Sequence, residues 1–67
     1  MDKKLARLVG RNVRLKFRAF QRLMANARRS SGIENFFVVA AVTGGMGLIC
    51  YSGNLRIVVS LADVVLI

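Results

Sequence analysis

The chain has 67 residues and a net charge of +8, with 11 Lys or Arg against three acids, one cysteine and no histidine. A chain this short buries little apolar surface, and it has no cysteine framework or metal-ligand set of the kind that stabilises small domains. The composition therefore excludes a large soluble core and a disulfide- or zinc-stapled domain, and it favours a chain that depends on an anionic and an apolar partner.

The charge along the chain changes abruptly at Asn35. Ten basic residues and no acid lie between Lys3 and Arg29, whereas the twenty-one residues from Asn35 to Leu55 carry no charge. At ~1.5 Å rise per residue, a helix of that length crosses a ~30 Å hydrocarbon layer. The pattern predicts an all-α membrane protein without an independent globular core: an N-terminal basic amphipathic helix in residues 1–32, one transmembrane helix in 33–55, and a short apolar C-terminal segment in 56–67.

The first segment predicts a helix over residues 3–29 that ends at Ser30, Ser31 and Gly32. At ~100° per residue, the apolar side chains from Leu5 to Ala27 gather in one arc and the basic ones lie opposite. We expect the arginines of this helix to contact anionic headgroups, and the candidates are Arg7, Arg11, Arg14, Arg18, Arg22, Arg28 and Arg29.

Three roles are open to such a helix. It resembles a mitochondrial targeting presequence in composition and pattern, and we expect it to be retained in the mature protein. It also suits an interfacial helix on anionic lipid such as cardiolipin, which is compatible with the first role. Closely spaced arginines also neutralise phosphates, but an apolar arc this wide needs an apolar surface. We therefore expect no nucleic-acid partner.

The uncharged segment contains a cluster of small residues at helical spacing. Small residues four apart let two transmembrane helices approach closely. The cluster predicts packing against another transmembrane helix, which belongs either to a second copy of this chain or to a larger protein. The alternative is that the cluster marks a kinked point in the helix. The residues concerned are Ala40, Ala41, Gly44, Gly45 and Gly47.

The orientation follows from the charge asymmetry. The basic segment is expected to stay on the matrix side of the mitochondrial inner membrane, or on the cytoplasmic side of a bacterial one. Tyr51 and Arg56 mark the far edge of the membrane helix, and a bend is expected near residues 52–54. Residues 56–67 are too short to cross again as a helix, so we expect another protein or the interface to cover them.

The residues offer no catalytic chemistry. The acids are isolated, and the glycines from Gly44 to Gly47 lack the Lys and Ser or Thr that follow in a phosphate-binding loop. Cys50 is expected to be a small packing residue. The sequence therefore predicts no enzyme, no catalytic or metal site and no cofactor.

A basic amphipathic helix, one glycine-bearing transmembrane helix and an apolar tail together resemble the single-span accessory subunits of mitochondrial inner-membrane respiratory complexes. The resemblance implies a non-catalytic role in stabilising or assembling such a complex, with larger transmembrane subunits and anionic lipid as partners. Respiratory complex I is the first candidate, followed by other respiratory complexes and ATP synthase. A single-span regulator of a transporter and a membrane-active cationic peptide are the alternatives.

Overall fold

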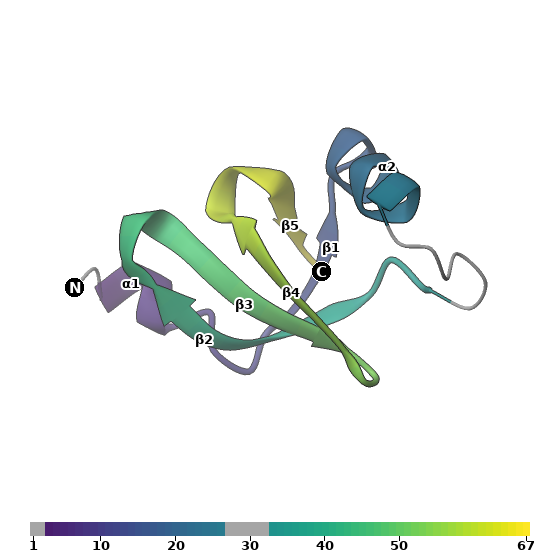
Figure 1. Ribbon diagram of the computed structural model, residues 1–67. Coiled ribbons are helices and arrows are strands. Elements are labelled where there is room, and N and C mark those ends of the chain that lie inside the picture. Colours follow the sequence, from purple (N-terminus) through teal and green to yellow (C-terminus); the bar gives the residue numbers. More distant parts are fainter. Residues whose placement is uncertain (1–2, 27–32) are drawn as a thin grey trace.

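The computed structural model describes residues 3–26 and 33–67, which form a five-stranded antiparallel sheet and two α-helices (Figure 1). The helices are α1 (Lys3–Ala6) and α2 (Phe17–Asn26). The strands are β1 (Asn12–Leu15), β2 (Phe37–Thr43), β3 (Gly47–Ser52), β4 (Leu55–Ser60) and β5 (Val64–Leu66). Two 3-10 turns complete the described elements, η1 (Gly44–Met46) and η2 (Leu61–Asp63).

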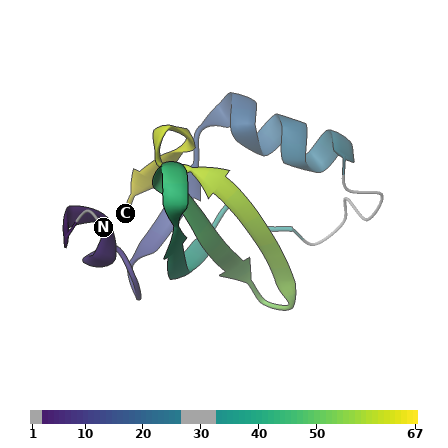
Figure 2. The ribbon, with the colours of Figure 1, turned by 60° about the vertical axis from the view of Figure 1, so that its left-hand side comes forward.

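The strand order in the sheet is β4-β3-β2-β1-β5. Strands β2, β3 and β4 follow one another as hairpins, while the last strand returns to pair with the first. The sheet is strongly twisted, and α1 and α2 lie at opposite ends of the molecule (Figures 1 and 2). Because β4 and β5 stand at the two ends of the strand order, they are the edge strands of the sheet.

The uncharged run forms strands because its side chains suit a pleated surface. Phe, Val and Thr make up five of the seven residues of β2, and β3 contains Ile49 and Tyr51; these residue types are enriched in strands. In β2, Phe37 and Val39 are buried whereas Val38 and Ala40 are exposed. Burial of every second residue is the period of a strand that covers a core with one face.

The glycines of this run allow the chain to reverse. Gly45 in the β2–β3 connection has φ 70°, and Gly53 in the β3–β4 connection has φ 59°. Both values lie in the left-handed region that glycine adopts without a Cβ clash. The bend that the sequence predicts near residues 52–54 is thus a hairpin turn between two strands.

The prediction of an all-α membrane protein is wrong. Residues 33–55 contain β2, η1 and β3 in place of a transmembrane helix. Among the helices in the described part of the chain, none has the length and apolar character needed to cross a bilayer. An apolar run has the same hydropathy whether it is one helix or two buried strands, and here the glycine turns divide it.

The predicted helix over 3–29 is wrong as one continuous element. β1 interrupts it, so that α1 has only four residues and α2 begins at Phe17. Gly10, with φ 87°, lies in the link that turns the chain from α1 into β1. The predicted helix end at residues 30–32 lies outside the described residues.

The chain has a core of its own, contrary to the prediction. α2 and all five strands contribute to one cluster of buried side chains. Among the apolar side chains of α2, Ala19 belongs to this cluster and Phe20 and Leu23 pack against it, whereas Phe17 is 73% exposed. The cluster consists of Val13, Leu15, Ala19, Phe37, Val39, Leu48, Cys50, Ile57 and Val64.

Residues 56–67, predicted as a separate apolar tail, belong to this fold. β4 pairs with β3 from Leu55 to Ser60, and β5 pairs with β1 from Val64 to Leu66. The Ser60 side chain accepts a hydrogen bond from the backbone N–H of Ala62, at 3.2 Å, in the turn between them. The neighbouring strands cover part of the apolar surface that the sequence assigned to a partner.

Asn35 extends the β1–β2 pairing with its side chain. Its Oδ1 accepts a hydrogen bond from the Leu15 N–H at 2.7 Å, and its Nδ2 donates one to the Leu15 carbonyl at 2.9 Å. Replacing Asn35 by alanine leaves both groups without these partners, so we expect the free energy of unfolding to fall by about 1–3 kcal/mol. Urea unfolding followed by circular dichroism measures the change. Asn12→Ala, at an exposed position, is the control, and an equal loss there contradicts this role of Asn35.

Candidate functional site

One row of exposed side chains runs across four strands on the side of the sheet away from the core. Asn12 pairs with Val38, Val38 with Tyr51, and Tyr51 with Arg56. All four are exposed, whereas their neighbours Val13, Val39 and Cys50 are buried. Side chains directly opposite on antiparallel strands have Cβ atoms about 4.5–5.5 Å apart, so the four make a continuous surface.

A second pair lies beside this row. Arg14 is exposed between the buried Val13 and Leu15 on β1. Val13 pairs with Phe37, so the antiparallel register continued by one residue places Phe36 opposite Arg14. The six residues together are called the outer face from here on: Asn12, Arg14, Phe36, Val38, Tyr51 and Arg56.

Large apolar side chains occupy the middle of the outer face. Phe36 is 44% exposed, Val38 39% and Tyr51 40%. Single exposed apolar residues are ordinary, but neighbouring ones mark interaction sites. Arg14 and Arg56 flank this centre in the strand register, so the outer face combines aromatic rings with cationic groups.

The electrostatics of the molecule favour an anionic partner. The whole chain has only three acids, Asp2, Glu34 and Asp63, against 11 basic residues. Every basic side chain whose burial the structure describes is exposed: Arg7, Arg11, Arg14, Lys16, Arg18, Arg22 and Arg56. An excess of one sign attracts oppositely charged molecules over a distance of about 8–10 Å at physiological salt.

The arginines predicted to share one helix face are distributed over several elements. Arg7 and Arg11 lie between α1 and β1, and Arg14 is on β1. Arg18 and Arg22 lie on the exposed side of α2. The last two predicted positions, Arg28 and Arg29, lie outside the described residues. The structure brings only Arg14 of this set to the outer face, where it joins Arg56.

The small residues predicted to pack against a helix lie in strands and a turn. Ala40 and Ala41 are in β2, next to an irregularity in its pairing with β3, while Gly44 and Gly45 belong to η1. Gly47 begins β3, where a Cβ would overlap the hydroxyl oxygen of Thr43. The helical spacing on which this prediction depends is absent, and the turn geometry accounts for Gly45 and Gly47.

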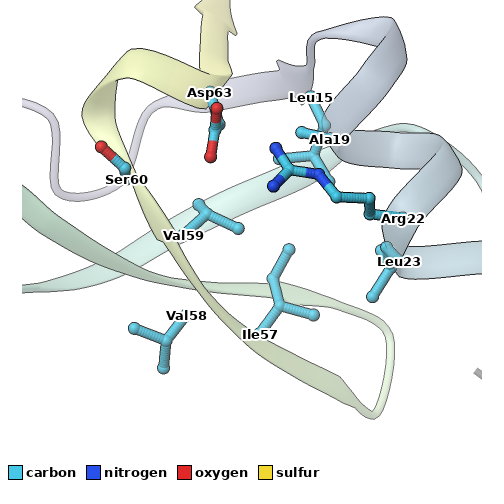
Figure 3. Close-up of a pocket in the computed structure, with 9 residues that line it drawn as sticks. All are labelled: Leu15, Ala19, Arg22, Leu23, Ile57, Val58, Val59, Ser60 and Asp63. Carbon is cyan, nitrogen blue, oxygen red and sulfur yellow. The ribbon is translucent and has the colours of Figure 1, made fainter. Parts of the chain in front are cut away.

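A groove lies between α2 and β4, on the opposite side of β4 from its partner strand β3 (Figure 3). Its volume is about 310 Å³. Leu15, Ala19, Leu23 and Ile57 supply apolar walls, and the guanidinium of Arg22 extends from α2 across the groove toward the end that holds Ser60 and Asp63 (Figure 3). The sequence did not reveal this groove, because its walls come from segments about 40 residues apart.

Cys50 belongs to the core, as the sequence predicts. It is fully buried on β3, and burial raises the pKa of its thiol above the ordinary value of 9.0. The unfolded chain therefore loses this proton first as the pH rises. Above pH 9 the unfolded state binds fewer protons than the folded state, so the free energy of unfolding falls with increasing pH.

We expect the Cys50→Ala variant to lose this dependence. Urea unfolding of both proteins is measured in steps from pH 7 to above pH 9, and the difference between the two profiles isolates the thiol because the proteins are otherwise identical. Parallel pH profiles for the wild type and the variant would contradict the assignment.

The described residues contain no other candidate centre. Within 3–26 and 33–67, no three His, Cys, Asp or Glu side chains are grouped so that they hold a metal ion. The same residues include no buried polar or charged side chain. The outer face, the groove and the exposed arginines are therefore the candidate sites among these residues.

The chain matches no known protein family model, no curated protein and no solved structure.

The sequence prediction missed the outer face as a unit, since it assigned Tyr51 and Arg56 to a membrane edge. One signal was present: Gly53 and Asn54 between two β-branched runs are typical of a two-residue hairpin turn. That turn makes Tyr51 and Arg56 cross-strand partners.

Proposed function

We propose that this protein is a non-enzymatic binding module that holds single-stranded nucleic acid on its outer face. The observation that supports this most directly is the placement of two exposed aromatic rings, Phe36 and Tyr51, between Arg14 and Arg56 on one face of the sheet.

The chemistry of a single strand suits this arrangement. Its bases are free to stack on aromatic side chains, and each such contact contributes about 1–3 kcal/mol. Its phosphates are neutralised by arginine, which releases bound counterions. Two rings and two flanking guanidinium groups therefore provide stacking for about two bases and charge for their backbone.

Part of the apolar arc that argued against a nucleic-acid partner contributes to the core of the protein. Val13 is buried in the core and Leu23 packs against it, whereas Phe17 is 73% exposed. Arg14, Arg18 and Arg22 remain exposed. These guanidinium groups are therefore accessible to phosphates, which supports the proposal.

The predicted roles at a membrane stay predictions. An accessory subunit of a respiratory complex, a transporter regulator and a membrane-active peptide all depended on a transmembrane helix in 33–55, where the structure has strands. The positive charge and the exposed apolar residues still suit anionic lipid. Vesicles are therefore the competing ligand in the test.

The test is a titration of the protein into short fluorescein-labelled oligothymidylate and oligouridylate, followed by fluorescence anisotropy at several salt concentrations. A duplex of the same length and vesicles containing phosphatidylglycerol are titrated in parallel. We expect the single strands to bind more tightly than the duplex, with an affinity that falls as salt rises. Equal binding of single strand and duplex, or binding of vesicles only, would overturn the proposal; the two oligonucleotides show whether RNA or DNA is preferred.

A further inference from the structure

The outer edge of β4 carries unpaired backbone groups. β4 pairs with β3 only, and Gly53 and Asn54 close their hairpin so that Ser52 faces Leu55. In an antiparallel ladder, alternate residues direct their N–H and C=O groups away from the partner. On β4 these residues are Arg56, Val58 and Ser60, and no described backbone bond outside the ladder involves them.

The groove between α2 and β4 opens directly onto this edge. Four consecutive β4 residues from Ile57 to Ser60 line it (Figure 3). The Val58 side chain points away from the groove and is 59% exposed. Val58 therefore borders the groove through its backbone, next to the apolar floor formed by Ala19 and Ile57.

The β4 edge also lacks several of the features by which proteins prevent strand pairing. Such edges commonly carry proline, lysine or a bulge. β4 has the sequence LRIVVS, its pairing with β3 is regular, and Arg56 is its single charge. The strand is thus suited to accept another strand.

We propose that the β4 edge binds an extended segment of a partner protein as a sixth strand, with apolar side chains at alternate positions and acidic side chains between them. Main-chain bonds to Arg56, Val58 and Ser60 supply affinity, as in other complexes formed by strand addition. The apolar side chains enter the groove, and the acidic ones lie on the side of the sheet that carries Arg56.

Charge favours such a partner over a second copy of this chain. A second copy brings another net charge of +8 and places a second Arg22 beside the joined edge. Like charges brought together at an interface suppress association. An acidic segment instead meets Arg56 with the opposite sign and is attracted by the net charge of +8.

The test uses a fluorescein-labelled Val-Glu-Val-Glu-Val peptide with blocked ends as the probe. Fluorescence anisotropy measures its affinity, and amide chemical shifts locate its site. We expect binding with shifts concentrated at residues 56–60. A Val-Lys-Val-Lys-Val peptide is expected to bind at least about fivefold more weakly than the acidic peptide. The same is expected of an acidic peptide that carries N-methyl groups along one edge.

The Val58→Pro variant removes one outward N–H from β4 without breaking the β3–β4 ladder. We expect it to lower the affinity for the acidic peptide about fivefold and to leave oligonucleotide binding unchanged. Leu66→Pro makes the matching change at the β5 edge and is expected to have no effect on the peptide. Because the methylated peptide is tested on the wild-type protein, the result does not depend on folding of the variant.

The proposal is overturned if the methylated or basic peptide binds as well as the acidic one, or if the shifts lie at Phe36, Val38 and Tyr51 on the outer face and not at residues 57–60. It is also overturned if the protein alone forms a dimer that Val58→Pro dissociates, because the β4 edge would then bind a second copy. None of these results decides the nucleic-acid proposal, which the oligonucleotide titration tests separately.

Discussion

Replacement of Phe37 by alanine is expected to lower the free energy of unfolding by about 3–5 kcal/mol. Phe37 is fully buried and belongs to the core cluster formed by α2 and the five strands. A domain of this length has a total stability of roughly 3–10 kcal/mol. We therefore expect a large part of the variant population to be unfolded at 37 °C, as measured by circular dichroism during thermal and urea unfolding.

Phe36→Ala is the matched control, because the same side chain is removed one position earlier. Phe36 is 44% exposed on the outer face, so its loss leaves no internal cavity. We expect a change in the free energy of unfolding of about 0.5 kcal/mol or less and a reduced affinity for single-stranded oligonucleotide. Equal destabilisation by the two substitutions would contradict the strand geometry at this position.

Replacement of Tyr51 by alanine is expected to weaken oligonucleotide binding by about 5- to 150-fold, the equivalent of the 1–3 kcal/mol of one base stacked on an aromatic ring. Tyr51 lies between Val38 and Arg56 in the row that crosses the sheet. Fluorescence anisotropy with oligothymidylate measures the affinity. Because the ring carries no charge, the slope of log affinity against log salt is expected to stay constant.

Arg56→Gln is the complementary variant. Removing one phosphate contact lowers the magnitude of the salt slope by about 0.7 for a single strand. Tyr51→Phe keeps the ring and is expected to bind almost as the wild type does. Binding driven by charge alone would give the reverse pattern: Arg56→Gln would weaken binding, and Tyr51→Ala would bind almost as the wild type does. That outcome would favour the predicted anionic lipid partner over nucleic acid.

Part of the fold was open to prediction from short-range patterns. Helix α2 lies inside the predicted amphipathic helix, and Phe20 and Leu23, which pack against the core, belong to the predicted apolar arc. A bend was also predicted near residues 52–54, where the structure has a hairpin turn at Gly53. These features depend on residues close together in sequence, so local propensity determines them.

The strands were missed for a physical reason. An unbroken apolar run suits a membrane helix and also a hairpin whose strands are covered by other segments. What selects the hairpin here is pairing with distant residues, such as Val13 with Phe37 and with Leu66. A hydropathy profile along the chain does not reflect such long-range contacts.

The sequence by itself determined the cationic character of this protein, the absence of histidine, the helical periodicity within α2 and the positions of the turn glycines. Only the tertiary structure decided which apolar side chains are buried. It placed Phe37 in the core and Phe36 outside, and it brought Tyr51 beside Arg56 and α2 beside β4. The reason is that a strand acquires an inner and an outer face only when other strands and a helix pack against one side of it.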